Sequence, residues 1–107
     1  MDIFDVYITY VSWGDSGKNR PVLVIELKET IVSVFSITTQ YENKNEMISS
    51  NYFKINDWSQ AGLFKQSYID TNMIRDIPIS AFDNKAEIGR LSENDVLMFI
   101  EFLSKRR

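Results

Sequence analysis

The sequence predicts an α+β domain, or small barrel, of mainly antiparallel strands with one C-terminal helix packed on it. Three observations predict this class. Short apolar segments separated by turn residues recur from Phe4 to Ile77, and only one late segment, 92–103, has the apolar spacing of an amphipathic helix. The shortage of crossover helices also excludes a doubly wound fold.

The first strand is predicted from Phe4 to about Val11 by a period of two rich in aromatic and β-branched residues. The two alternating sets are Phe4, Val6, Ile8 and Tyr10, and Asp5, Tyr7 and Thr9. A loop over 12–19 is expected next, because it contains the turn formers Gly14, Asp15, Ser16 and Gly17. A connection of this length predicts a mobile or functional segment.

The stretch 13–25 runs from a tight polar loop into an apolar strand. Pro21 fixes its own φ and pushes Arg20 towards an extended conformation, so we expect the guanidinium to leave the chain at the entrance of a buried strand over 22–27. The segment from Ile31 to Thr39 is its natural antiparallel partner across the turn 28–30. These two strands are predicted to form the centre of the sheet.

The middle of the chain is predicted to hold shorter elements. A solvated loop over 41–50 precedes a strand over 51–55, after which Asn56 or Asp57 is expected to cap a single helical turn closed by Gly62. Two extended segments, 66–71 and 73–77, are expected with a break around 70–72. Pro78 prevents the second from being an uninterrupted central strand.

The last element has the clearest local signals. Ser92 is a predicted N-cap with Asp95 at N3, and Leu91 and Val96 occupy the positions of a hydrophobic staple. The face expected to be buried follows the three- and four-residue spacing, which gives Val96, Phe99, Ile100 and Leu103. Basic residues over 105–107 complement the negative end of the helix dipole.

Composition narrows the function classes. A chain of 107 residues is expected to form one domain, 1–107, near the size at which oligomerisation adds burial. It has no cysteine and no histidine, so catalysis would have to use Arg, Lys, Asp, Glu, Ser, Thr or Tyr. Early acids without a signal-peptide pattern, and no long apolar run, predict a soluble cytoplasmic protein that does not enter a membrane.

Each motif has an ordinary structural interpretation. The segment Gly14 to Lys18 lacks the Walker spacing and precedes a strand, so it is not a phosphate-binding P-loop. The segment 18–20 is most simply a solvated charge run, and Thr38 and Thr39 are ordinary strand residues. The net charge of −3 argues against bulk electrostatic coating of nucleic acid, although twelve basic residues remain to build a local groove.

Two segments in order resemble the MazF/PemK family of toxin endoribonucleases from toxin–antitoxin pairs. They are R-P-V-L-V-I at 20–25 and S-I-T-T-Q at 36–40. Two further segments, N-D-W-S-Q-A-G-L at 56–63 and I-G-R-L-S-E-N-D-V at 88–96, resemble the PemK-like branch. The resemblance covers nearly the whole chain and is strongest over 6–40 and weakest over 44–50.

The resemblance implies a fold, an activity and partners. The fold would be an SH3-like, CcdB/PemK-like barrel with a short mid-chain helix and a C-terminal helix, assembled as a homodimer. The family cleaves single-stranded RNA at short sequences without a metal, so neither metal nor cofactor is expected, and a cognate antitoxin occupies the RNA groove. Its catalytic arginine and threonine match Arg20 and Thr38.

Elementary chemistry makes this pair intelligible. RNA can cleave itself when the 2′-hydroxyl attacks the adjacent phosphate, so an enzyme need supply only alignment, charge neutralisation and proton transfer. Arg20 offers a planar fork for phosphate oxygens, and the hydroxyl of Thr38 can orient an oxygen or relay a proton. The general base is not identified, and Asp15 is one candidate.

Neighbouring residues are candidates for holding the RNA. We expect phosphate or base contacts from Trp13, Lys18, Asn19, Gln40 and Tyr41. The loop residues Gly14, Asp15, Ser16 and Gly17 are expected to form a flexible flap over the site.

The alternative is a protein-binding toxin on the same fold, like the CcdB gyrase poisons, or a catalytically inactive binding module. Arg20 and Thr38 favour the nuclease, because a gyrase poison has no use for this pair. A purely structural domain is a third reading, and it predicts no toxicity on expression.

Overall fold

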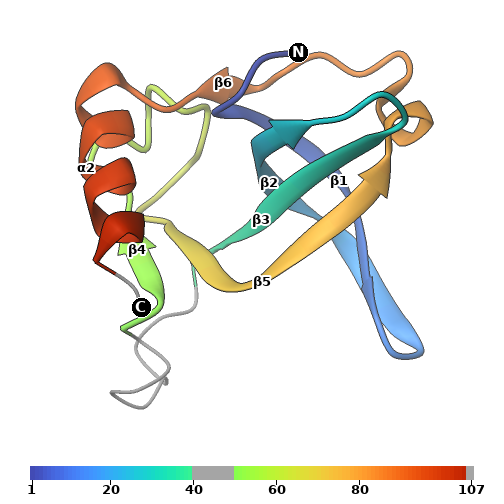
Figure 1. The fold of residues 1–107 in the computed structure, drawn as a ribbon, viewed down its shortest axis with the longest axis horizontal. Helices are drawn as coiled ribbons and strands as arrows, with labels where there is room; N and C mark the ends of the chain where they lie inside the picture. The colour runs from blue at the N-terminus through green and yellow to red at the C-terminus, as the bar shows by residue number, and fades with distance from the viewer. Residues whose placement is uncertain (40–49, 106–107) are drawn as a thin grey trace.

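The computed structural model describes residues 1–39 and 50–105 of the chain. Within this part, six strands form one antiparallel sheet in the order β4-β5-β3-β2-β1-β6 (Figure 1). The strands are β1 (Asp5–Trp13), β2 (Ser16–Leu27), β3 (Ile31–Thr38), β4 (Tyr52–Lys54), β5 (Tyr68–Pro78) and β6 (Gly89–Arg90). A 3-10 helix, η1 (Ile79–Phe82), follows β5, and the α-helix α2 (Glu93–Ser104) comes last.

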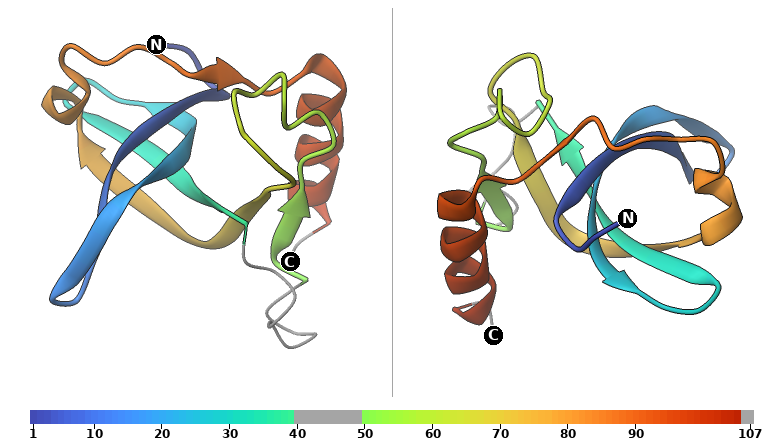
Figure 2. Two further views of the ribbon diagram at one scale, coloured as in Figure 1. Left: turned by 180° about the vertical axis from the view of Figure 1, so that it is seen from behind. Right: turned by 90° about the horizontal axis from the view of Figure 1, so that it is seen from above.

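The sheet curls into a half-barrel with one helix beside it, which agrees with the predicted small barrel. Viewed from above, β1, β2, β3 and β5 curve around a common interior (Figure 2). Helix α2 stands at one end beside β4, and the tip of the β1–β2 hairpin projects away from it (Figure 1). The prediction that β2 and β3 form the centre of the sheet is confirmed.

The expected loop over 12–19 is wrong, because these residues continue the two strands. The register runs through Ser12↔Gly17 to Trp13↔Ser16, so only Gly14 and Asp15 form the turn. Gly14 has a φ of 57°, a left-handed conformation that glycine adopts without strain from a Cβ atom. Ser16 and Gly17 therefore belong to β2, and a flexible flap over the site stays a prediction.

The period of two is present in β1, but from Ile8 onward the buried and exposed positions are the reverse of the expected pattern. Ile8 and Tyr10 are 42% and 58% exposed, whereas Thr9 and Val11 are buried. Val6 and Tyr7 are both buried because each joins a different core cluster, one on each face of the strand. A period of two defines two faces and does not say which one the fold covers.

The expected break around 70–72 is also wrong, because β5 is continuous through it. Pairing with β3 passes from Ser36↔Asp70 to Val34↔Arg75, so residue 35 of β3 lies opposite residues 71–74 of β5. This bulge absorbs the polar triplet without ending the strand. Thr71 is tied down by its Oγ1, which donates to the Asn51 carbonyl at 2.6 Å.

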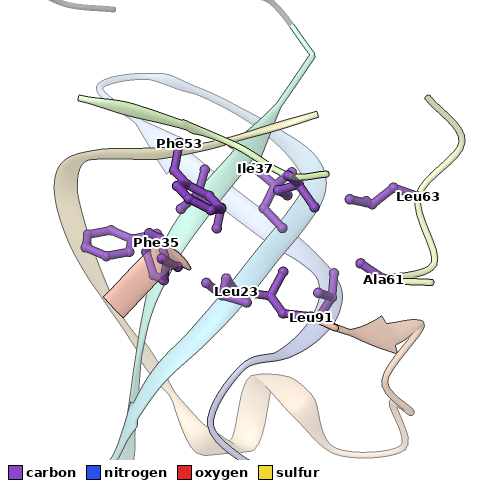
Figure 3. Packing of buried hydrophobic residues seen from close by; sticks show 11 residues of the cluster. Leu23, Phe35, Ile37, Phe53, Ala61, Leu63 and Leu91 are labelled. Carbon is purple, nitrogen blue, oxygen red and sulfur yellow. The ribbon is translucent and has the colours of Figure 1, made fainter. Parts of the chain in front are cut away.

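Two apolar cores lie on the two faces of the curled sheet. One fills the inside of the curl and contains Tyr7, Val11, Val22, Val24, Val32, Val34, Ile77 and Phe82. The other lies between the sheet and α2 and includes Leu23, Phe35, Ile37, Phe53, Ala61, Leu63 and Leu91 (Figure 3). The fully buried ring of Phe99 packs on Phe53 and Phe35, at centroid distances of 5.1 and 6.2 Å.

Ser92 caps α2 as predicted. Its side chain accepts a hydrogen bond from the Asp95 backbone N–H at 3.1 Å and donates one to Asp57 Oδ2 at 2.6 Å. Asp95 is completely buried, and its carboxylate accepts the backbone N–H groups of Asn56 and Asp57 at 3.1 and 2.8 Å. These bonds connect the first turn of α2 to the segment that follows β4.

The predicted single helical turn is present only as an isolated turn, in which the Ala61 N–H donates to the Asp57 carbonyl at 3.2 Å, and no helix continues from it. Its end has the predicted glycine, because Gly62 has a φ of 85° and the N–H groups of Gly62 and Leu63 donate to Ser59 and Trp58. A Cβ atom on Gly62 would also collide with the backbone carbonyl of Ile88. The segment therefore packs backbone against backbone beside β6.

The predicted apolar face of α2 is correct except at Ile100, which is 50% exposed. Phe102 packs on the core in its place, together with Val96 and Leu103. The buried stripe is centred on Phe99, and residues three and four positions away share its face. Ile100, the next residue after Phe99, is rotated away from that stripe. Residues 106 and 107 of the predicted basic end lie outside the described residues.

Among the described residues, no helix has the length and apolar character needed to cross a membrane. The cytoplasmic location stays a prediction.

We expect Phe99→Ala to lower the free energy of unfolding by about 4 kcal/mol, because it leaves a cavity among four aromatic rings, those of Phe4, Phe35, Phe53 and Phe102. Ile100→Ala is the matched control from the same turn of α2, and it should change stability by no more than about 0.5 kcal/mol. Urea denaturation followed by circular dichroism measures both. Similar losses for the two variants would contradict the described orientation of α2.

Candidate functional site

A polar cleft of about 330 Å³ opens where β2, β3, β4 and β5 come together. We call it the Arg20 cleft. Its lining is drawn from all four strands and the residues beside them, namely Lys18, Asn19, Arg20, Pro21, Ile37, Thr38, Thr39, Tyr52, Ser67 and Asp70. Segments far apart in the sequence therefore meet in one concave site.

Arg20 and Thr38 are brought together by the central strand pair. The last paired residues at this end are Val22 and Ser36, and Arg20 and Thr38 each lie two residues beyond that pair, on β2 and at the end of β3. Both side chains are half-buried and line the cleft. Arg20 lies within β2, which begins at Ser16, so the expectation that it stands at a strand entrance is wrong.

Tyr52 and Asp70 form the opposite side of the cleft. The Tyr52 hydroxyl donates to Asp70 Oδ2 at 3.3 Å. The other carboxylate oxygen, Oδ1, accepts the Asn72 backbone N–H at 2.9 Å and the Asn72 side-chain amide at 2.8 Å. Both oxygens of the half-buried Asp70 carboxylate therefore accept hydrogen bonds, one from Tyr52 on β4 and the other from Asn72 on β5.

The charges in the cleft act on the pKa of Tyr52. Burial raises the pKa of Tyr52 above its ordinary 10.0, and the charge of Asp70 and their hydrogen bond raise it further. The positive charge of Arg20 acts in the opposite direction and lowers the same pKa. Arg20 and Asp70 are therefore both close enough to act electrostatically on one phenol.

This arrangement combines three chemical capacities. Arg20 supplies a delocalised cation with a fork of N–H donors, Thr38 supplies a hydroxyl, and Asp70 supplies a carboxylate. A phosphodiester fits such a site, because its oxygens match the guanidinium and its neighbouring hydroxyl can give a proton to the carboxylate. Ser67 contributes less, since its buried hydroxyl already donates to the Lys65 carbonyl at 2.9 Å.

The predicted binding residues divide into three groups. Lys18 and Asn19 are exposed and line the cleft beside Arg20. The backbone of Trp13 pairs with Ser16 at the end of the β1–β2 hairpin, and the segment 14–17 is not part of the cleft lining. Gln40 and Tyr41 lie outside the described residues.

Two residues of the site were missed by sequence reasoning. The sequence pattern predicts only a strand at Tyr52 and a break between strands at Asp70. A usable signal was present, because a polar Asp-Thr-Asn triplet inside an otherwise strand-like segment favours a bulge, and bulges are frequent beside active sites. Asp15, the earlier candidate base, is exposed in the hairpin turn and outside the cleft.

The described part of the chain offers no set of side chains suited to bind a metal ion. Within residues 1–39 and 50–105, acidic side chains form no group of three or more able to hold a metal ion.

We expect Asp70→Asn to lower the pKa of Tyr52, because it removes a negative charge that opposes ionisation of the phenol. The measurement is the pH dependence of the Tyr52 ζ-carbon NMR signal. Asp83→Asn removes an exposed charge beyond η1 and should leave this titration unchanged. A Tyr52 pKa that stays the same or rises in Asp70→Asn would contradict the described contact.

Comparisons with known proteins give no relative from which a role could be transferred. Neither the protein-family models nor the curated proteins include a match to this chain.

Proposed function

We propose that this protein is a metal-independent endoribonuclease that cleaves single-stranded RNA, the toxin of a toxin–antitoxin pair. The observation that carries the proposal is that Arg20 and Thr38 line one cleft together with Asp70. The resemblance to MazF/PemK toxins independently assigns the catalytic roles to the first two of these residues. An SH3-like barrel assembled as a homodimer, with an antitoxin as partner, belongs to the same proposal.

The proposed reaction is attack of a ribose 2′-oxygen on the adjacent phosphorus. A bond from O2′ to phosphorus forms, and the bond from phosphorus to the 5′ oxygen of the next nucleotide breaks. Asp70 accepts the 2′-hydroxyl proton, and the leaving 5′ oxygen takes a proton from water in the open cleft. The products are a 2′,3′-cyclic phosphate and a 5′-hydroxyl.

Each side chain has a separate task in this reaction. Arg20 neutralises the charge that builds on the phosphorane oxygens, where a fixed donor has its largest effect. Thr38 orients a phosphate oxygen through its hydroxyl. Tyr52 holds Asp70 in place, because its hydroxyl donates to the carboxylate that must face the ribose.

We expect the purified protein to cleave single-stranded RNA in EDTA, and Arg20→Ala and Thr38→Ala each to lose about a hundredfold or more in kcat/KM. Arg20→Lys should also be strongly impaired, since a point charge cannot reproduce the bidentate fork. Lys28→Ala removes an exposed cation at the β2–β3 turn and serves as the control. Full cleavage by a folded Arg20→Ala variant would refute the mechanism.

We expect Asp70→Asn to lower kcat by about a hundredfold, because a neutral amide cannot accept the proton. Asp15→Asn should retain wild-type activity, since Asp15 lies in the hairpin turn away from the cleft. Single-turnover cleavage of a fluorescent RNA measures the two rates. The opposite ranking would return the role of base to Asp15.

A protein-binding toxin of the gyrase-poison type is the competing function. It would inhibit DNA supercoiling and leave RNA intact, so a supercoiling assay run beside the RNA assay separates the two classes. The cleft favours the nuclease, because an arginine, a hydroxyl and a carboxylate converge there. A small acidic or DNA-binding protein encoded next to this chain would add support for the toxin role.

A further inference from the structure

A second cleft, of about 430 Å³, lies where the half-barrel is open between β1 and β5. These two strands are not neighbours in the sheet, and the residues of η1 and those after it close one end of the opening. We call it the seam cleft. The lining residues that matter here are Tyr10, Ser12, Asn19, Arg75, Asp76 and Lys85.

Two cations reach across the seam cleft to the edge of β1. Strand β6 pairs only with Asp5 and Val6, so the rest of that edge faces the opening. Arg75 Nη1 donates to the Ser12 carbonyl at 3.1 Å, and Lys85 Nζ donates to the Ile8 carbonyl at 3.4 Å. These bonds hold both positive groups at the mouth of the cleft.

Most N–H donors of Arg75 and Lys85 are not used by their bonds to β1 and can bind an anion. A guanidinium has five N–H donors and an ammonium has three, and each bond to β1 uses one. The acidic side chain in the lining, Asp76, already accepts the hydroxyl of the buried Ser33 at 2.6 Å. The charged side chains that line the seam cleft therefore sum to one positive charge.

The seam cleft adjoins the Arg20 cleft through Asn19, which lines both. Asn19 precedes Arg20 on β2 and pairs with Tyr10 on β1. Tyr10 is 58% exposed, and a Cβ atom on Gly17 would approach its hydroxyl oxygen to 2.5 Å, so the ring lies over this glycine. An exposed aromatic face supported by the backbone is suited to stacking on a base.

We propose that the seam cleft binds a nucleotide that flanks the scissile phosphate, with its phosphate on Arg75 and Lys85 and its base on Tyr10. The RNA passes over Asn19 from one cleft to the other. This inference rests on the proposed function and adds a subsite to it. Arg75 and Lys85 also cover the open edge of β1, which is a structural role that requires no ligand. The binding experiment below distinguishes this role from the proposed subsite.

Binding of a non-cleavable RNA tests the subsite without requiring activity. The probe is a fluorescent 2′-O-methyl RNA of about ten nucleotides, and its anisotropy is measured at several salt concentrations. Arg75→Gln retains a donor for the Ser12 carbonyl while removing the charge, and Lys85→Gln does the same for Ile8. Lys28→Gln removes a cation at the far β2–β3 turn and is the matched control.

We expect the double variant Arg75→Gln/Lys85→Gln to bind the probe about tenfold more weakly than Lys28→Gln. The slope of log affinity against log salt should become shallower by about 1.4, which corresponds to two lost phosphate contacts on a single strand. Tyr10→Ala should weaken binding about tenfold without changing the slope. Circular dichroism checks that each variant is folded.

A cleavage comparison separates the subsite from the reaction. With a dinucleotide substrate the double variant should match the control, whereas with the longer unmodified RNA its KM should rise and its kcat should stay unchanged. Seam variants that bind and cleave as Lys28→Gln does would overturn the inference and leave the proposed function standing. Binding that depends on the seam in a protein that cleaves no RNA would show an RNA-binding cleft but overturn its role beside a scissile phosphate, together with the nuclease.

Discussion

The antiparallel pairing of β2 with β3 is the constraint on which the candidate site depends. Val22 and Val24 on one face and Leu23 on the other are completely buried, as are Val32 and Val34 on the partner strand. A slip of one residue would exchange the two faces of β2, so burial on both sides fixes the register. The same two strands carry Arg20 and Thr38, each two residues beyond the pair Val22↔Ser36, so core packing positions the strand ends that line the cleft.

The other half of the cleft depends on a longer chain of contacts. Phe99 of α2 packs on Phe53, and the buried carboxylate of Asp95 holds the backbone N–H groups just after β4. Helix α2 thus fixes β4, whose Tyr52 pairs in register with Asp70. A helix with no residue in the cleft therefore positions the tyrosine and, through it, the carboxylate.

Local sequence signals were sufficient where one interaction decides the structure. The Ser92 cap, the turn over 28–30 and the central strand pair follow from capping, turn and burial patterns. The errors at 12–19 and at 70–72 have a different cause, since glycine and short polar residues are compatible with a loop, a two-residue turn or a bulge. Pairing with distant strands selects among these, and for Asp70 this pairing also creates its place in the site.

The central claim is that the Arg20 cleft promotes attack by a ribose 2′-oxygen, and the chemical ends of cleaved RNA test it most directly. Mass spectrometry of products formed in EDTA from an RNA with one 2′-deoxy substitution at the cleaved nucleotide, beside the all-ribose RNA, measures them. The account predicts a 2′,3′-cyclic phosphate and a 5′-hydroxyl from the all-ribose RNA, and no cut at the substituted position. Products with a 5′-phosphate, or cleavage at the deoxy position, would contradict it.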